Sequence, residues 1–403
     1  MNKNKQKMTP LELRSATSLA LIYFLRMFGL FMLLPVLSLY TEAMSGATPL
    51  LIGLAIGIYG LTQAMLQIPF GIFSDRFGRK PVIAIGLLIF AFGSVIAALS
   101  DDIYILILGR ALQGAGAIAA AVMALASDLT RESQRTKTMA IIGVTIGMAF
   151  TLSFIAGPVL DIWLGLDGLF WMAALLGLLA IGVLFVWVPN VHDVDQKEIE
   201  SDPEKKNFLA VLKNPELLRL DISILILHLV LTASFVVLPL ALRDYAGLDS
   251  AQHWKTYLPV MLLSLVFMIP FIRLAEKQNA QKNLAKPIFI GATILLAFAE
   301  LGLWKGYTST IWLSAMMLAF FTAFNYLEAT LPSLVSRTAP SERKGAALGV
   351  YSTSQFFGAF IGGTMGGWLY GEVGIGNVFL VNAILIIIWI AIIVPMQITP
   401  AKH

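Results

Sequence analysis

The sequence predicts an all-α polytopic membrane protein, with twelve transmembrane helices arranged as two six-helix pseudo-repeats. Three observations lead to this fold class. First, 58% of the 403 residues are hydrophobic and 13% are charged, and the mean hydropathy is +0.81, which exceeds what a soluble domain can bury. Second, apolar runs of about 20 residues, the length that crosses a bilayer, recur along nearly the whole chain. Third, short motifs of the first half return in the second half.

The apolar runs predict twelve spans, and the first is too long for the core of a signal peptide. The predicted spans are 16–41, 49–74, 81–100, 103–128, 137–163, 168–189, 218–242, 253–275, 286–305, 310–336, 344–371 and 376–397. The polar stretch DVDQKEIESDPEKK is of mixed charge and poor in aromatic residues, which is typical of a linker. We therefore expect an N-terminal half at 1–189, a cytoplasmic linker at 190–217 and a C-terminal half at 218–403.

The repeat rests on five pairs of short motifs in the same order in both halves. The pairs are LPVL at 34 with LPLA at 238, IPFGIFSDR at 68 with IPFIRLAEK at 269, Lys80-Pro81 with Lys286-Pro287, Ser133 to Arg135 with Ser341 to Arg343, and Gly143-Val144 with Gly349-Val350. Parallel repeats of this kind are typical of secondary transporters, whose substrate site lies between the halves.

The distribution of Lys and Arg predicts the orientation. The amino terminus, the linker, the carboxyl tail and the loops on their side hold 23 of these residues, whereas the opposite side holds Arg243, Lys255 and Lys305. The positive-inside rule then places both termini in the cytoplasm. We expect a multi-pass protein of the plasma membrane, in bacteria the inner membrane.

The segment GIFSDRFGRKP, between spans 2 and 3, concentrates charge between two apolar runs. Asp75 would lie at the carboxyl end of span 2, where the helix dipole disfavours an acid. We expect Asp75 to meet the amino terminus of span 11 near Lys344 and to latch the two halves, with Gly71 allowing close approach. The alternative is a topology signal only. The residues of this predicted latch are Gly71, Asp75, Arg76, Gly78, Arg79, Lys80 and, at the end of span 4, Asp128.

Polar residues inside the spans are the candidates for the substrate and proton pathway, because an ionisable residue in the membrane is costly. Tyr59, Gln63 and Gln67 recur at every fourth position and form one stripe of span 2. The same spacing argument puts Arg110 with Gln113 and Asn325 with Glu328 on single helix faces. The full set is Arg26, Tyr59, Gln63, Gln67, Arg110, Gln113, His228, Asn325, Glu328 and Gln355. Interhelical hydrogen bonds without a transport role are the alternative.

Glu328 is the predicted proton carrier, because burial favours the protonated form of a carboxyl group. The alternative is a static partner for His228, which is itself a candidate proton relay or a packing residue. We expect Arg26 to be a fixed charge that faces an anionic group or a buried acid. Glu300 is expected near the outer interface and solvated.

These residues resemble the major facilitator superfamily. Gly71, Asp75-Arg76 and Gly78 to Lys80 resemble its loop 2–3 signature. LGRALQGAGAIAAAV, with Arg110 and Gln113, resembles the fourth-span motif of its drug–proton antiporters, and Gly157-Pro158 resembles the core of their fifth-span motif. Asp161 and Ser153 stand where that motif has glycine, and Arg26 lies in a span where such exporters often hold an acid. SDRFGRKP and ALQGAGAIAAAVMALASDLTRE resemble the YajR-type exporters, which carry an extra carboxyl-terminal domain, whereas this sequence ends six residues after the last predicted span.

The sequence thus predicts a secondary transporter that alternates access by rocking two halves, and the resemblance implies proton-coupled export of small organic molecules. A symporter or uniporter that imports a sugar or an organic anion is the alternative, and a non-transporting membrane sensor is a remote one. We expect no enzyme activity, since the sequence offers only His228 and Glu328 as catalytic candidates. We expect no cofactor and no metal, because the chain has no Cys, no His ligand spacing and no GxxxxGK[ST] nucleotide motif. The expected partners are a small-molecule substrate, protons and the lipid bilayer, with no nucleic acid, and the expected state is a monomer.

Overall fold

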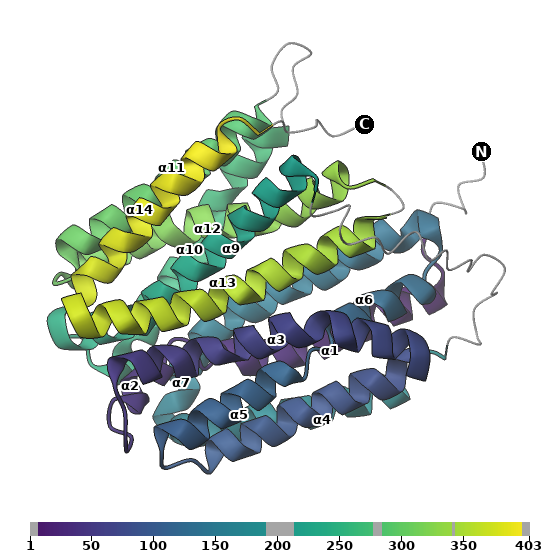
Figure 1. Ribbon diagram of the computed structural model, residues 1–403, viewed down its shortest axis with the longest axis horizontal. Coiled ribbons are helices and arrows are strands. Elements are labelled where there is room, and N and C mark those ends of the chain that lie inside the picture. Colours follow the sequence, from purple (N-terminus) through teal and green to yellow (C-terminus); the bar gives the residue numbers. More distant parts are fainter. Residues whose placement is uncertain (1–6, 191–212, 277–283, 341–342, 397–403) are drawn as a thin grey trace. The chain divides into compact units, whose positions relative to one another are not determined.

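A computed structural model describes residues 7–190, 213–276, 284–340 and 343–396, and each regular element in these ranges is a helix (Figure 1). The long helices are α1 (Pro10–Phe31), α3 (Pro49–Phe77), α4 (Arg79–Ala98), α5 (Ile103–Ala115), α6 (Ala119–Asp128), α7 (Glu132–Val186), α9 (Pro215–Leu240), α10 (Trp254–Glu276), α11 (Ala285–Gly306), α12 (Thr310–Thr338), α13 (Lys344–Val373) and α14 (Ile375–Ile393). The short ones are α2 (Leu37–Thr41), the π-helical turn η4 (Ala241–Tyr245) and the 3₁₀ turn η5 (Ser250–Gln252).

The helices confirm the predicted all-α membrane fold. In the described part of the chain, ten helical segments are long and apolar enough to cross a membrane. One of them, the 55-residue α7, turns at Gly165, whose φ of 64° interrupts the helix, so α7 contains the predicted fifth and sixth spans. The 30-residue α13 corresponds to span 11, and its many glycines lower its hydropathy.

Two predicted spans are not continuous helices. The first, 16–41, ends its helix at Phe31, and a turn that contains Pro35 leads into α2. The fourth, 103–128, is broken after Ala115, and residues 116–118 are not helical. Proline removes a backbone donor, and glycine lowers the cost of leaving the helix, which explains where these breaks occur.

The described residues cluster into two compact units. Unit 1 is formed from residues within Met1–Leu37 and Thr62–Ser201, and unit 2 from residues within Ser38–Leu61 and Asp202–His403. Residues 38–61, which we expected in the N-terminal half, therefore cluster with the second half. Most of the predicted linker, from 191 to 212, lies outside the described residues.

Unit 1 is built around α1 and α7, with α4 to α6 and the second part of α3 beside them. Helix α1 begins at a capping box, in which Thr9 and Glu12 satisfy each other's backbone N–H groups. Glu12 also accepts hydrogen bonds from Nε and Nη2 of Arg131, at 2.8 and 2.9 Å. These hydrogen bonds raise the pKa of Arg131, which lies between α6 and α7. The start of α1 is thereby tied to the start of α7.

Unit 2 is built around α9, whose side chains are almost all buried, and α13, which runs beside it (Figure 1). A Cβ atom at Gly358, Gly362 or Gly366 would collide with the backbone of α9. On another side of α13, a Cβ atom at Gly363 or Gly367 would collide with the backbone of α3. The glycines of α13 thus bring two neighbouring helices into backbone contact, as small residues do in membrane proteins.

The helix caps add a repeat that the sequence comparison missed. Helix α1 starts at Thr9-Pro10 and α9 at Asn214-Pro215, and in both the polar side chain accepts hydrogen bonds from the first turn. Proline is favoured at the first helical position, where its missing N–H has no partner to lose. The first helix of each half therefore begins with the same local structure.

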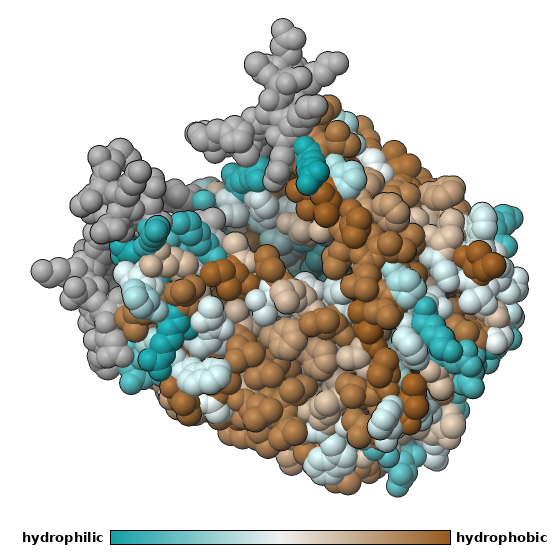
Figure 2. Space-filling view, turned by 180° about the vertical axis from the view of Figure 1, so that it is seen from behind, coloured by the Kyte–Doolittle hydropathy of each residue, from teal (hydrophilic) through white to brown (hydrophobic). Residues whose placement is uncertain are grey.

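Hydrophobic side chains cover most of the face seen in Figure 2, and hydrophilic residues gather near its edges. The most exposed large side chains include Trp163 and Ile311, each 84% exposed. Apolar surface of this extent suits the hydrocarbon of a bilayer rather than water.

Candidate functional site

Three polar side chains from different helices meet inside unit 2. Nε2 of His228, on α9, lies 3.1 Å from Oε2 of Glu328, on α12. Nε2 of Gln355, on α13, lies 2.8 Å from Nε2 of His228 and 3.1 Å from Oε1 of Glu328. We refer to these three residues as the histidine–glutamate cluster. All three were among the candidates named from the sequence, and the structure brings them into contact.

The hydrogen bonds of this cluster depend on the position of a proton. A ring nitrogen with hydrogen donates and one without hydrogen accepts, so Nε2 of His228 cannot donate to Glu328 and accept from Gln355 at once. With hydrogen on Nε2, His228 donates to Glu328 and leaves Gln355 to bond the carboxylate. Without it, Nε2 accepts from Gln355 or from a protonated Glu328. The position of this hydrogen therefore decides which hydrogen bonds the three side chains can make.

The surroundings leave one end of the cluster open. The side chain of Glu328 is 31% exposed, whereas that of His228 is 10% exposed. The ring of Phe324 lies edge-on to the imidazole, with 5.8 Å between the ring centroids. Asn325, predicted to share a face with Glu328, donates instead to Oγ of Ser264 on α10, at 3.0 Å. The carboxyl group of Glu328 is thus partly accessible, while His228 is held against the ring of Phe324.

A second polar cluster lies in unit 1 around Arg26, which is fully buried on α1. Its Nη2 donates to Oε1 of Gln63 and to the carbonyl oxygen of Gly116, both at 2.9 Å. Its guanidinium carbon lies 5.6 Å from the centroid of the Phe90 ring, within the range of a cation–π contact. The break between α5 and α6 turns the Gly116 carbonyl away from the helix, which makes it available to Arg26.

The fourth-span residues form a chain of hydrogen bonds in unit 1. Nη1 of Arg110 donates to Oε1 of Gln113 at 2.7 Å, and Nε2 of Gln113 donates to Oγ of Ser94 on α4 at 2.8 Å. Both Arg110 and Gln113 are buried, as their shared helix face predicted. Glycines make this close packing possible, because a Cβ atom at Gly93 would lie 2.6 Å from the backbone nitrogen of Gln113.

The predicted stripe of span 2 is buried along its whole length. Tyr59, Gln63 and Gln67 are 6%, 0% and 2% exposed. Tyr59 belongs to unit 2 and the two glutamines belong to unit 1, because the boundary between the units falls after Leu61 of α3. Oε1 of Gln67 makes no hydrogen bond to the described residues.

The charged segment after α3 forms an ion-pair network within unit 1. Arg79 forms an ion pair with Asp75, and its Nε lies 2.9 Å from Oδ2 of Asp128. Nη1 of Arg79 also donates to Oγ of Ser74 at 2.8 Å, and Ser74 donates to the carbonyl oxygen of Gly71 at 2.7 Å. Arg79 thereby joins the end of α3 to the end of α6.

The remaining residues of this segment shape the turn from α3 to α4. Gly78 has a φ of 93°, which other residues rarely adopt. Nζ of Lys80 donates to the carbonyl oxygen of Val188 and to Oδ1 of Asn190, at 2.7 and 2.8 Å. Arg76 is exposed, with its guanidinium carbon 5.4 Å from the centroid of the Phe77 ring. Lys80 therefore anchors the end of α7, and Arg76 remains on the surface.

Gly157 and Pro158 lie inside α7, where this helix passes the end of α1. A Cβ atom at Gly157 would collide with the carbonyl oxygen of Met32. Pro158 lacks the N–H that a helix interior uses. The fifth-span motif thus sets how closely α7 approaches α1.

Sequence reasoning missed a cluster of charged residues in unit 2. Nη2 of Arg243 lies 2.6 Å from Oε2 of Glu42, and the hydroxyl of Tyr370 donates to Oε1 of Glu42 at 3.1 Å. Arg243 also pairs with the neighbouring Asp244. The charges are far apart in sequence and lie next to loops, so no helical spacing marked them.

The expectation for Glu300 was wrong. Glu300 is not solvated near an interface but fully buried, and it accepts a hydrogen bond from Oγ of Ser234 at 2.7 Å. Its helix packs against α12 and α14.

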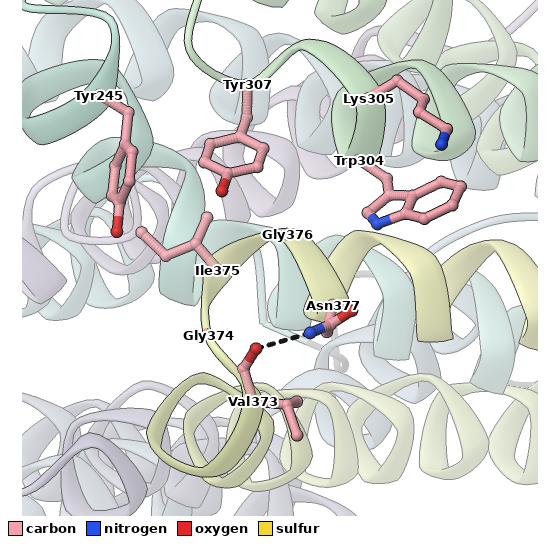
Figure 3. Close-up of a pocket in the computed structure, with 9 residues that line it drawn as sticks. All are labelled: Tyr245, Trp304, Lys305, Tyr307, Val373, Gly374, Ile375, Gly376 and Asn377. Atoms are coloured by element: carbon pink, nitrogen blue, oxygen red, sulfur yellow. Dashed lines mark hydrogen bonds between the residues drawn. The ribbon is translucent and has the colours of Figure 1, made fainter.

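A pocket of about 360 Å³ lies at the ends of α11 and α13 (Figure 3). It is lined by Tyr245, Trp304, Lys305, Tyr307, Val373, Gly374, Ile375, Gly376 and Asn377, and Asn377 donates to the carbonyl oxygen of Val373. None of the predicted site residues lines this pocket, which is shallow and open. The histidine–glutamate cluster is therefore the stronger candidate site.

Comparison with known proteins places this architecture in a family. The model of the Major Facilitator Superfamily matches residues 19–363 and, in a second match, 282–402. The chain belongs to the major facilitator superfamily, and it is a multi-pass membrane transport protein.

Individual relatives agree with this assignment. The inner membrane transport protein YajR of Escherichia coli (strain K12) is 49% identical over 399 residues, which are 98% of this chain and 86% of the relative. The multidrug resistance protein MdtH of Yersinia enterocolitica is 27% identical over 85% of this chain and 83% of the relative. The fold is also found in the crystal structure of a bacterial homologue of the human lysosomal transporter Spinster, in an inward-facing and occupied conformation. The TM-score is 0.75 at 14% sequence identity, and the match covers 96% of this chain and 97% of that chain.

Proposed function

We propose that this transporter exports small organic molecules in exchange for protons, across the bacterial inner membrane, with both termini in the cytoplasm. The histidine–glutamate cluster carries the proposal, because it joins a partly exposed carboxyl group to a buried imidazole within hydrogen-bonding distance. Two groups can pass a proton directly only when they lie within hydrogen-bonding distance, so this geometry is the first requirement. The names of the two relatives, a membrane transport protein and a multidrug resistance protein, support the transport of small molecules.

Glu328 takes the role of proton carrier, and His228 that of its relay. Protonation of Glu328 removes its negative charge and changes which hydrogen bonds Gln355 can make. Because these residues lie on α12, α9 and α13, a change in their bonding acts on three helices of unit 2 at once. Protonation of Glu328 is thereby coupled to movement of these helices.

The charged segment after α3 supplies the second part of the proposal. In the cytoplasm-closed state, Asp75 engages the positive amino-terminal end of α13, and Arg79 holds the carboxylate in position from within unit 1. Replacement of Asp75 by Asn should slow exchange between the two access states without loss of folding. The alternative role, a topology signal, requires only the basic residues and leaves Asp75→Asn as active as wild type.

Proteoliposomes that contain a pH-sensitive dye test the coupling. Proteoliposomes of wild type and of Glu328→Gln are each exposed to a panel of candidate substrates. The panel contains amphipathic cations, neutral organic molecules and organic anions. Glu372→Gln is the matched control, because it makes the same chemical change at an exposed position of α13. Substrate-driven proton movement in wild type and Glu372→Gln, reduced at least tenfold in Glu328→Gln, is the expected result.

The direction of the proton signal separates the alternatives. Protons that move against the substrate establish antiport, and protons that move with it establish symport. Symport of an organic anion is the second candidate, and the two buried arginines Arg26 and Arg110 favour it. Substrate movement without a proton signal would reduce Glu328 to a structural partner of His228.

A further inference from the structure

A second buried acid of unit 2 takes no part in the proposed mechanism. Glu300, on α11, is fully buried six residues before the end of its helix. Oγ of Ser234, on α9, donates to its Oε1 at 2.7 Å. Asn382, on α14, donates from Nδ2 to the same Ser234 oxygen at 2.9 Å, and is itself fully buried. Three helices thus meet at one acid, one hydroxyl and one amide.

The carboxyl, hydroxyl and amide groups of this site have too few hydrogens to give each oxygen a hydrogen bond. Ser234 has a single hydrogen, which it gives to Glu300, and it accepts from Asn382. Two buried oxygens, Oε2 of Glu300 and Oδ1 of Asn382, then remain without a donor among the described residues. Buried polar atoms are normally satisfied, because water is not there to replace a missing partner. A proton on Oε2 would convert one surplus acceptor into a donor.

Among the described residues, none compensates a negative charge on Glu300 by an ion pair. In the described chain, no Lys, Arg or His forms an ion pair with Glu300, and α14 carries no ionisable residue at all. His228, on α9, lies within hydrogen-bonding distance of Glu328 and Gln355. Nζ of Lys305 lies 3.8 Å from the centroid of the Trp304 ring. The other ionisable side chains that the structure describes on α9, α10, α11 and α12 are Glu216, Arg219, Asp221, Lys255, Tyr257, Arg273, Lys286, Tyr326 and Arg337. Burial of an uncompensated carboxylate is strongly unfavourable.

We propose that Glu300 is a second proton-binding residue, which holds a proton on Oε2 as a neutral carboxylic acid between α9, α11 and α14. One proton from water binds one carboxylate oxygen, and no other bond changes. A monovalent metal ion fits the site less well. Asn382 presents its Nδ2, a donor, to Ser234, whereas a cation needs oxygens turned toward it.

The position of the site connects it to the histidine–glutamate cluster. Ser234 follows His228 by six residues of α9, which corresponds to about 9 Å along the helix axis. A movement of α9 that alters one cluster therefore alters the other. This inference goes beyond the proposed function and does not depend on it, because protonation of Glu300 is measurable without transport.

Infrared difference spectroscopy of the purified full-length protein tests the proposal. A protonated carboxyl group has a C=O stretching band that a carboxylate lacks. At neutral pH we expect such a band in wild type and in Glu372→Gln, and its loss in Glu300→Gln. An unchanged band in Glu300→Gln would show that Glu300 is ionised and would overturn the proposal.

Two further measurements cover the case in which Glu300→Gln does not fold. Asn382→Leu removes the amide that donates to Ser234 beside the carboxyl group, and should shift the frequency of the band while the protein remains folded. An unshifted band in Asn382→Leu would show that the band does not come from Glu300 and would contradict the proposal. Thermal unfolding of wild type with Na⁺ replaced by choline should leave the melting temperature unchanged, and a marked fall would assign the site to a cation instead.

Discussion

The two polar clusters inside the units differ in what their central charge can do. In unit 1, Arg26 is fully buried and donates to the neutral oxygens of Gln63 and Gly116. In unit 2, Glu328 is partly exposed and contacts the titratable His228. A guanidinium keeps its proton at all physiological pH values, whereas a carboxyl or imidazole group can exchange one. The first cluster is therefore suited to a fixed structure, and the second to a switch.

Replacement of Arg26 by Met should produce the largest loss of stability. It leaves the buried oxygens of Gln63 and Gly116 without their donor, and the free energy of unfolding should fall by about 2–5 kcal/mol. Chemical or thermal unfolding of the detergent-purified protein measures it. Arg14→Met, an exposed change on the same helix, is the control and should change the free energy by less than about 1 kcal/mol. Equal losses of stability in Arg26→Met and Arg14→Met would contradict the structural role inferred for Arg26.

Replacement of Gly116 by Ala should be the next most harmful change. The added Cβ atom would collide with the carbonyl oxygen of Gly86, so the carbonyl that accepts from Arg26 must shift. Overpacking of this kind costs about 1–3 kcal/mol. Gly143→Ala in α7 is the control, because no atom lies within 4 Å of its added Cβ, and it should be neutral or stabilising by about 0.5–1 kcal/mol. A stable Gly116→Ala would show that the helix break is not held by close packing.

Replacement of Gln355 by Leu should cost less, about 1 kcal/mol, because one partly exposed amide loses its hydrogen bonds. Its main effect should fall on transport. With the amide gone, the bond between His228 and Glu328 no longer competes with another partner, and the dependence of the transport rate on pH should change. Rates measured across a pH series in proteoliposomes, with the exposed Gln252→Leu as control, test this. An unaltered pH profile would separate Gln355 from the proton pathway.

Replacement of Glu328 by Gln should have the smallest effect on stability, below about 1 kcal/mol, because glutamine is isosteric and the side chain is 31% exposed. This is the sharpest contrast with Arg26, since the residue proposed to matter most for proton coupling should matter least for folding. Unfolding curves of the variant and of Glu372→Gln should coincide. A loss as large as that of Arg26→Met would identify Glu328 as structural.

The spans and most candidate residues could be predicted from the sequence because they depend on local patterns. Apolar run length predicts a membrane helix, and His228, Glu328 and Gln355 were marked as candidates because they are polar residues within such runs. The breaks at Pro35 and Gly116 were not predicted, although the run GAG at 114–116 was a visible signal. A helix break depends on what replaces the lost hydrogen bonds, and here Arg26 on another helix supplies one of them.

The sequence by itself determined the membrane fold, the helix caps and which residue types lie within the spans, because these follow from contacts between residues close in the chain. The tertiary structure decided which polar side chains meet: the contact of Gln355 with His228 and Glu328, the ion pair of Glu42 with Arg243, and the burial of Glu300 against Ser234. Helical periodicity gives the direction of a side chain around its own helix but not the neighbour that it faces. That neighbour is set by how whole helices pack, where glycines admit close backbone contact and larger side chains prevent it.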